Sequence, residues 1–315
     1  MSRDNETATD TAFDLRDGPC RALVPKPMPL PPSFLLSGTT VLGDAAMGTA
    51  LQARGLPVGL APERWNLERP ETVSAIHRLH VAAGARWIQT NTFGGNRVRL
   101  AASGLEGEVE QIAAAAVRCA QNAAGDAAVV GCVGPAGGDP DGWGAAYAEQ
   151  CEALVRHGVS GLVVETILSL AEGTAAIRAA VETGAWVMAS FTPGMDGNLL
   201  DGTPAEAAGE CFVRSGAAAI GVNCGFGPEM MLGAVRRLAA AGLAPVLARP
   251  NAGLPEWEDG LACYRLQPDA FARAAIQFRE AGASLIAGCC GTTDQHLHAA
   301  AQLLDARTGE TRHDA

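Results

Sequence analysis

Basic clusters and aromatic side chains are scarce in this 315-residue sequence. Phe, Trp and Tyr make up 5% of the residues, and Lys and Arg number 23 against 34 Asp and Glu. The net charge of −11, without any long basic run, argues against a nucleic-acid partner. No apolar run reaches the roughly 18–20 residues of a membrane-spanning helix. The first residues, MSRDNETATDTAFD, carry acids where a targeting peptide carries bases, so we expect a cytoplasmic protein.

A disulfide framework is not indicated either, although the sequence contains nine cysteines. The cytoplasm keeps thiols reduced, so a long chain expected there does not depend on such a framework. We expect most of the cysteines to pack as small apolar side chains. A cysteine with a chemical role must therefore be identified from its position in the fold.

The central part of the sequence alternates between short apolar runs and segments with helical spacing. The runs are continuously apolar and often β-branched, which is typical of strands buried on both faces of a sheet. The expected strands are Thr40–Gly43, Trp87–Thr90, Ala128–Val133, Gly161–Glu165, Trp186–Phe191, Ala218–Val222, Pro245–Ala248 and Ser284–Ala287. The expected helices are Pro70–Ala83, Glu106–Ala123, Gly144–His157, Leu170–Thr183, Pro204–Ser215, Pro228–Ala241, Pro268–Ala281 and Asp294–Leu304.

Eight strand–helix units, without a second region of different composition, predict a single-domain (β/α)8 TIM barrel. Roughly 250 residues suffice for such a barrel. A doubly wound parallel sheet is the alternative arrangement of the same units. We expect the barrel to occupy residues 38–306. Residues 1–37, with their proline-rich stretch, are expected to form a flexible arm, and residues 307–315 a C-terminal tail.

Polar residues and cysteines stand where several of the expected strands end. In an α/β barrel the loops after the strands converge on one mouth, which carries the chemistry. The residues at these ends are Asp44 after the first strand, Thr90 at the second, Glu165 at the fourth, Asn223 and Cys224 at the sixth, and Cys289 and Cys290 after the eighth. The barrel is thus expected to bring one cysteine of the sixth strand close to a pair from the eighth.

Three cysteines at one mouth form a suitable set of zinc ligands. Zn²⁺ prefers four ligands, and a catalytic site leaves one position open for water or substrate. A thiol entering that position loses its proton, whereas a free thiol of pKa about 8.5 is barely ionised at neutral pH. From these residues alone, packing and redox roles remain alternatives, because a vicinal cysteine pair is a weak signal. His77, His80, His296 and His298 lie on expected helices, and we assign none of the six histidines a metal role.

Five motifs in order resemble those of the homocysteine S-methyltransferase family. They are GDAAMGT, TNTFGGN, GVNCG, PNAGLP and AGCCGTT, each at an expected strand end. This family includes betaine–homocysteine and S-methylmethionine–homocysteine methyltransferases and the homocysteine domain of cobalamin-dependent methionine synthase. The likeness extends from about Asp44 to about Leu304. It implies a (β/α)8 barrel that methylates homocysteine with zinc at its mouth.

The resemblance also implies roles for individual residues. Cys224, Cys289 and Cys290 match the zinc ligands, while Glu165 and Asp44 match the acids beside the homocysteine amino group. The remaining acceptor residues are the backbone of Ala46, Met47 and Gly48, which would receive the carboxylate, and the neighbours Thr90 and Asn223. Two positions depart from the family pattern, because Ala45 and Ala287 replace glycines. Alanine would be strained there if the backbone required a positive φ.

The methyl donor is expected to be a small onium compound of the betaine or S-methylmethionine type. The aromatic faces of Trp65, Phe93 and Trp143 are candidates for holding its cation, although Gly94 and Thr166 stand where the betaine enzymes carry tyrosines. One barrel leaves no room for folate or cobalamin domains, so a separate corrinoid protein is a second possible donor. Another thiol as acceptor, and a non-catalytic zinc- or thiol-binding barrel, are the remaining alternatives.

Overall fold

The structure is a computed structural model that describes residues 39–258 and 261–310. The arm expected at residues 1–37 lies outside these ranges. Eight parallel strands alternate with helices, as the apolar runs predict. The strands are β1 (Val41–Leu42), β2 (Trp87–Gln89), β3 (Ala128–Val133), β4 (Gly161–Ile167), β5 (Trp186–Phe191), β6 (Ala219–Cys224), β7 (Val246–Pro250) and β10 (Ala283–Ile286).

The strands follow one another around a barrel. Their hydrogen-bonded order is β1-β10-β7-β6-β5-β4-β3-β2, with every pairing parallel. The two ends of this order meet where the Arg86 N–H donates to the Leu42 carbonyl at 2.8 Å. A doubly wound sheet would instead reverse its strand order at a switch point. The fold is therefore a (β/α)8 TIM barrel, and the alternative sheet is excluded.

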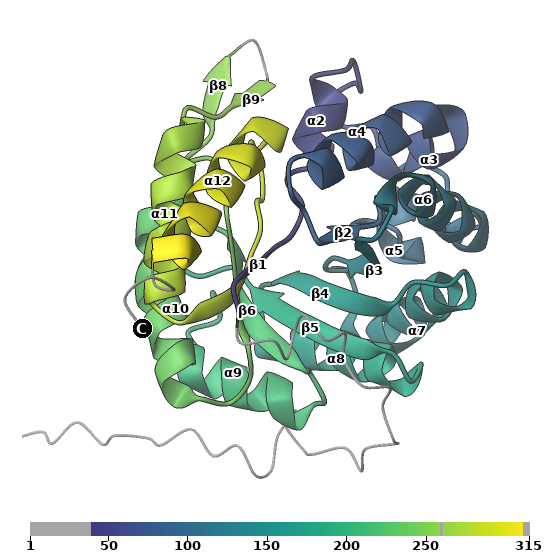
Figure 1. Cartoon of the computed structure of the whole chain (residues 1–315). Coiled ribbons are helices and arrows are strands. Elements are labelled where there is room, and N and C mark those ends of the chain that lie inside the picture. The colour runs from purple at the N-terminus through teal and green to yellow at the C-terminus, as the bar shows by residue number, and fades with distance from the viewer. Residues whose placement is uncertain (1–38, 259–260, 311–315) are drawn as a thin grey trace, which may run out of the picture.

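Helices cover the outside of the barrel (Figure 1). They are α4 (Pro70–Ala82), α6 (Val109–Ala124), α7 (Pro140–Arg156), α8 (Leu170–Glu182), α9 (Ala205–Arg214), α10 (Pro228–Ala241), α11 (Pro268–Glu280) and α12 (Asp294–Glu310). Their bounds lie within three residues of the expected ones, except that α7 begins at Pro140 instead of Gly144 and α12 continues past Leu304. No helix among the described residues is long and apolar enough to cross a membrane.

Two tryptophans fill the inside of the barrel. Trp87 and Trp186 begin β2 and β5 and are almost fully buried in an apolar cluster formed by alternate strand residues. Each indole lies against a glycine: a Cβ atom at Gly43 would lie 2.3 Å from the Trp87 ring, and one at Gly161 would lie 2.2 Å from the Trp186 ring. The small residues and large rings together give the barrel a packed interior below its mouth.

The loops at the mouth contain short elements that the sequence pattern did not predict. The loop after β1 forms α2 (Gly48–Gln52), η1 (Pro62–Arg64) and α3 (Trp65–Glu68). The loop after β2 forms α5 (Arg97–Ala101), and a hairpin, β8 (Glu256–Glu258) with β9 (Leu261–Cys263), follows β7. These elements shape the wall of the site.

Candidate active site at the barrel mouth

A pocket of about 720 Å³ opens at the carboxyl ends of the strands. Its volume falls within the roughly 300–1,000 Å³ of small-molecule sites. Asp44, Glu165, Cys224 and Cys289 all line it, so four strand ends far apart in the sequence contribute to one wall. The convergence of strand-end loops expected for a barrel is therefore observed.

The three singled-out cysteines meet in this pocket. The Sγ atoms of Cys224, Cys289 and Cys290 all lie within 4.8 Å of one another, and all three residues are half-buried. Sulfur ligands about 2.3 Å from a shared tetrahedral zinc ion would be about 3.8 Å apart. The three residues thus fit a metal ion, and all three line the pocket.

The charges of the three thiols also favour a metal. Hydrogen bonds from the Cys289 and Cys290 thiols lower the pKa of Cys224 well below its usual range. The same contacts with Cys224 raise the pKa of Cys289 and of Cys290. One thiol of the cluster therefore loses its proton readily. If all three ionised, three negative charges would lie side by side, and a cation between them would be needed to stabilise them.

Backbone contacts hold the cysteine loops in place. Cys224 ends β6 with a left-handed φ of 64°, which non-glycine residues rarely adopt. The Asn251 side chain donates to the carbonyl of Gly225 at 2.8 Å. On the other loop, the Cys289 N–H donates to the Pro250 carbonyl and the Ala252 N–H donates to the Cys290 carbonyl, both at 2.8 Å. The loops after β6, β7 and β10 are thereby joined around the sulfur atoms.

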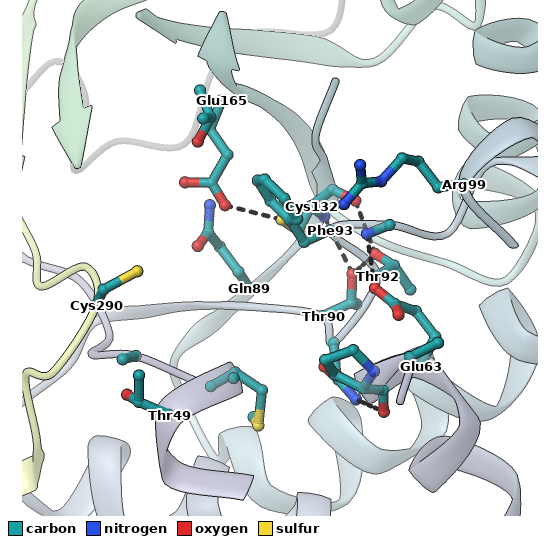
Figure 2. A pocket seen from close by; sticks show the side chains of 18 of the residues that line it. Thr49, Glu63, Gln89, Thr90, Thr92, Phe93, Arg99, Cys132, Glu165 and Cys290 are labelled. Carbon is teal, nitrogen blue, oxygen red and sulfur yellow. Dashed lines mark hydrogen bonds between the residues drawn. The ribbon is translucent and has the colours of Figure 1, made fainter. Parts of the chain in front are cut away.

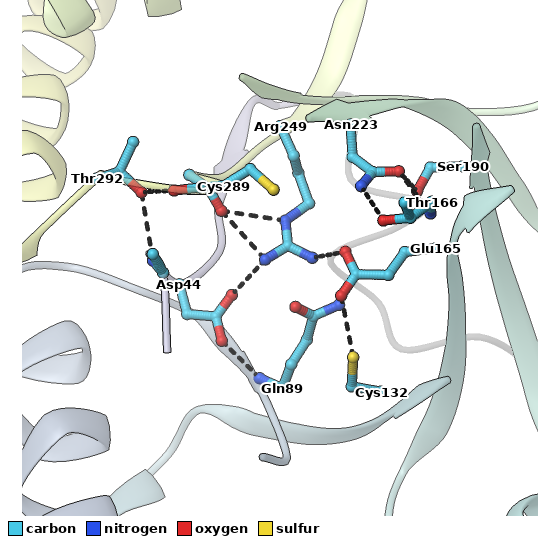
Figure 3. A network of polar contacts seen from close by, with 12 residues as sticks. Asp44, Gln89, Cys132, Glu165, Thr166, Ser190, Asn223, Arg249, Cys289 and Thr292 are labelled. Atoms are coloured by element: carbon cyan, nitrogen blue, oxygen red, sulfur yellow. Dashed lines mark hydrogen bonds and ion pairs between the residues drawn. The ribbon is translucent and has the colours of Figure 1, made fainter. Parts of the chain in front are cut away.

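A buried arginine joins the two predicted acids (Figure 3). Arg249, on β7, donates from Nη1 to Glu165 at 2.6 Å and from Nη2 to Asp44 at 3.3 Å. Its Nε and Nη2 atoms also donate to the Gly288 carbonyl, next to the cysteine pair. The guanidinium lies over the Trp87 ring, 5.7 Å from the ring centroid. The sequence reading missed this residue, which is 3% exposed.

Burial controls the ionisation of the two acids. It raises the pKa of Asp44 to about 7, while Arg249 and the Gln89 N–H, which donates to Asp44 at 2.8 Å, act in the opposite direction. Burial likewise raises the pKa of Glu165, and Arg249 opposes it. The thiol of Cys132, a second residue that the sequence reading missed, lies 2.9 Å from Glu165. The acids therefore form a desolvated network in which Arg249 supplies the main compensating charge.

Comparison with known proteins agrees with this geometry. The profile of the Homocysteine S-methyltransferase family matches residues 41–304. The chain belongs to this family. It is therefore an enzyme of the homocysteine S-methyltransferase family, as the five strand-end motifs predicted.

Several relatives support this membership. The methionine synthase of Mycobacterium tuberculosis is 33% identical over 290 residues, which cover 84% of this chain but 24% of that protein. The chain thus spans about a quarter of the methionine synthases that it matches. Betaine–homocysteine S-methyltransferase 1 of Bos taurus is 30% identical over 310 residues, covering 87% of this chain and 74% of that protein. The metallated form of the homocysteine methyltransferase MmuM from Escherichia coli has a TM-score of 0.73 and 26% identity, covering 88% of this chain and 99% of that one.

The two alanines that depart from the family motifs fit their backbone without strain. The described non-glycine residues with positive φ are Thr166 and Cys224, so neither Ala45 nor Ala287 needs the conformation that favours glycine. Both side chains are buried in apolar clusters, Ala287 inside the barrel and Ala45 against Ile88. Alanine at these two positions is therefore compatible with the backbone at the barrel mouth of this family member.

The remaining acceptor residues divide into two groups. Ala46, Met47, Gly48 and Thr90 line the pocket, as expected. Asn223 does not line the pocket: its side-chain oxygen accepts from the Thr166 N–H at 2.9 Å, and its side-chain nitrogen donates to the Thr166 hydroxyl at 2.8 Å. The side chain of Asn223 thus holds the left-handed turn at Thr166, which does line the pocket.

Two of the three aromatic candidates also lie elsewhere. Trp65 is 3% exposed, packs in a cluster with Leu51 and Ile76, and does not line the pocket. Trp143 packs on the outer core, and its indole N–H donates to the Gly137 carbonyl at 2.9 Å. Trp143 therefore supports a loop of the pocket without lining it. Phe93 does line the pocket and is 37% exposed.

The far wall of the pocket carries charged residues that the sequence reading did not select. Glu63 of η1 and Arg99 of α5 line it, together with Phe93 (Figure 2). Glu63 is 3% exposed, and its carboxylate accepts from the Gly94 N–H at 2.6 Å. No signal in the sequence distinguished these residues, because they belong to short loop helices without a periodic pattern.

Proposed function

We propose that this chain is a zinc-dependent S-methyltransferase that moves a methyl group from a small onium donor to homocysteine and so forms methionine. The observation that carries this proposal is the meeting of three cysteine sulfurs with the Asp44–Arg249–Glu165 cluster in one pocket. Family membership supports the acceptor. The donor set of three sulfurs supports the metal, because thiolates are zinc ligands and catalytic zinc keeps three protein ligands and one open position.

Cys224, Cys289 and Cys290 would hold the zinc ion. When bound, Zn²⁺ keeps an incoming thiol in its thiolate form at neutral pH, and the proton passes to solvent. The sulfur of the acceptor then attacks the methyl carbon in line. A sulfur–carbon bond forms as the bond from the methyl group to the onium atom breaks, so the donor leaves as a neutral amine or thioether.

The acids beside the metal site are suited to the amino group of the acceptor. Asp44 and Glu165 carry two negative charges when ionised, and Arg249 neutralises one, which leaves one charge for an ammonium group. Met47 and Gly48 offer backbone N–H groups for the carboxylate, since the N–H of Ala46 already donates to Thr292 at 3.2 Å. Homocysteine would thus be held by its sulfur at one end and by its amino-acid head at the other.

Loss of one cysteine tests the metal and the activity together. We expect about one zinc per chain in the wild type, and Cys290→Ala to lose both the metal and methionine formation. Cys263→Ala is the matched control, because Cys263 lies on the β8–β9 hairpin and does not line the pocket. Zinc is measured by elemental analysis and methionine by mass spectrometry.

A donor panel with homocysteine separates the alternatives. Betaine, S-methylmethionine, S-adenosylmethionine and dimethylsulfoniopropionate are supplied in turn, and a methylated corrinoid protein is supplied separately. Methionine from the corrinoid protein alone would replace the small-donor proposal. Full turnover in a metal-free preparation would refute the role of zinc, and zinc binding without turnover from any donor or thiol would favour a binding protein.

A further inference from the structure

The far wall of the pocket holds a buried carboxylate, that of Glu63, which forms no ion pair with the described residues. The Glu63 carboxylate accepts from the Gly94 N–H at 2.6 Å, and Arg99, a charged neighbour among the described residues, is not bonded to it. Burial raises the pKa of its carboxyl group, and the backbone donors and Arg99 oppose this only in part. A desolvated carboxylate is costly unless a cation or several donors face it. A cationic ligand group in the pocket would supply this missing partner.

The position of Glu63 is fixed by a polar cluster behind it. The Asn91 side chain donates to the Pro62 carbonyl at 2.8 Å and to the Asn66 side chain at 3.0 Å. The Asn66 side chain donates in turn to the Asn91 carbonyl at 2.8 Å. These bonds attach η1 and α3 to the end of β2. Glu63 is therefore presented on a rigid wall, as a binding group needs to be.

Arg99 provides a positive charge on the same wall. It lies on α5, whose first turn is capped by the Asn96 side chain accepting from the Arg99 N–H at 3.0 Å. Within the described part of the chain its guanidinium forms no hydrogen bond or ion pair. Its neighbour Arg97, by contrast, is paired with Glu149 away from the pocket. Arg99 thus has its donors available for an anion.

The wall beside the cysteines, which we call the near wall, differs in how its acids are paired. There Asp44 and Glu165 are both bonded to Arg249, so their cluster retains one uncompensated negative charge beside the metal site. Glu63 and Arg99 are a separate pair of opposite charges, and Figure 2 places them on one side of the pocket with Cys290 on the other. Such a pair is complementary to a zwitterion.

We infer that Glu63 and Arg99 bind the α-amino-acid head group of the methyl donor, the ammonium on Glu63 and the carboxylate on Arg99. This rests on the proposed function and specifies its donor class. The transferable methyl group must reach the sulfur held by the cysteines across the pocket, so it must be several bonds from the head group. A sulfonium on an amino-acid side chain meets this condition. Betaine does not, because one methylene separates its nitrogen from its carboxylate.

The chemistry of this donor balances without a further reactant. The acceptor thiolate forms a bond to the methyl carbon, and the bond from that carbon to the sulfonium sulfur breaks with both electrons passing to sulfur. The donor leaves as a neutral thioether that still carries its amino-acid head. Phe93, also on the far wall, offers an aromatic face near the path of the cation.

Steady-state kinetics with paired variants tests the assignment. At saturating homocysteine, Arg99→Gln and Glu63→Gln should each lower kcat/KM for S-methylmethionine about tenfold or more, the loss expected for one charge-assisted hydrogen bond. The KM for homocysteine and the zinc content should stay within twofold of the wild type. Arg97→Gln on the same helix is the matched control. Turnover of trimethylsulfonium, which has no head group, should be equal in all four proteins.

The outcomes separate this inference from the proposed function. Three results would overturn the head-group site. They are an unchanged kcat/KM for S-methylmethionine in both variants, a rise in the KM for homocysteine in its place, and a wild type that prefers betaine to S-methylmethionine. If no donor is turned over, calorimetry still decides: S-methylmethionine should bind the zinc-loaded wild type and the Arg97→Gln variant, and should bind Arg99→Gln and Glu63→Gln at least tenfold more weakly. Equal binding to all would reject the site.

Discussion

Replacing Arg249 with methionine should destabilise the protein strongly, because it leaves two buried acids without their shared cation. Arg249 is 3% exposed, and its guanidinium donates to Glu165, to Asp44 and twice to the Gly288 carbonyl. Methionine retains much of the side-chain volume over Trp87 but none of the donors. The change therefore tests the charge network and disturbs the packing little.

The expected loss is about 3–5 kcal/mol, the range for removing one partner of a buried ion pair. With a urea dependence of roughly 3 kcal/mol per molar for a chain of this size, the unfolding midpoint should fall by about 1 M or more. A second change, Glu165→Gln, removes the more closely bonded acid. The Arg249→Met/Glu165→Gln double variant should therefore regain part of the loss, because one unpaired charge is gone.

Urea unfolding followed by circular dichroism measures these differences on metal-loaded protein. Arg97→Met is the matched control, since it removes an exposed pair with Glu149, which contributes little. Its midpoint should equal that of the wild type. A midpoint of Arg249→Met equal to the wild type, or a double variant less stable than Arg249→Met, would refute the reasoning that Arg249 compensates these acids.

Two further changes test other parts of the molecule. Glu165→Gln should raise the KM for homocysteine about tenfold while zinc remains bound, because one charge-assisted contact to the amino group is lost; an unchanged KM with full zinc content would remove Glu165 from the acceptor site. Burial lowers the pKa of His77 to about 4, so the unfolded chain takes up a proton below about pH 6.5 that the folded one does not. Stability should therefore fall by roughly 3 kcal/mol more in the wild type than in His77→Leu between pH 6.5 and pH 4, as measured by urea unfolding; parallel pH profiles would contradict a neutral buried His77.

The barrel and its cysteine cluster were predictable because two regular features act together. Continuous apolar runs locate parallel strands, and barrel closure places every strand end at one mouth. Cys224, Cys289 and Cys290 therefore met as expected, although more than sixty residues separate the first from the pair. The closed geometry of the barrel, not the spacing in the chain, made this prediction possible.

Arg249 was missed because the seventh strand was expected to end at Ala248. The strand continues to Pro250, and side chains alternate along it, so Leu247 lies inside the barrel and Ala248 outside. The same alternation predicts that the side chain of the next residue, Arg249, points into the barrel. An arginine at such a position requires buried acids, and two were already predicted at the ends of β1 and β4.

The positions of the aromatic candidates could not be predicted for a different reason. Phe93 lies in the loop after β2, Trp65 on the four-residue α3, and Trp143 in the first turn of α7, ahead of the helix expected from Gly144. No long periodic pattern in the sequence fixes the direction of a side chain at these positions. The short α3 turns Trp65 into the core against Leu51, and only the tertiary fold decides this. The Glu63 and Arg99 wall escaped prediction for the same reason.

The tryptophans that fill the barrel have a consequence for how ligands enter and leave the pocket. Trp87 and Trp186 fill the barrel axis below the pocket, so a ligand bound in the pocket among the described residues has to enter and leave through the mouth above. A ligand bound near the mouth therefore controls the exit of a ligand bound deeper in the pocket. A compound that lodges at Phe93 would thus hold a bound thiol in place without touching it.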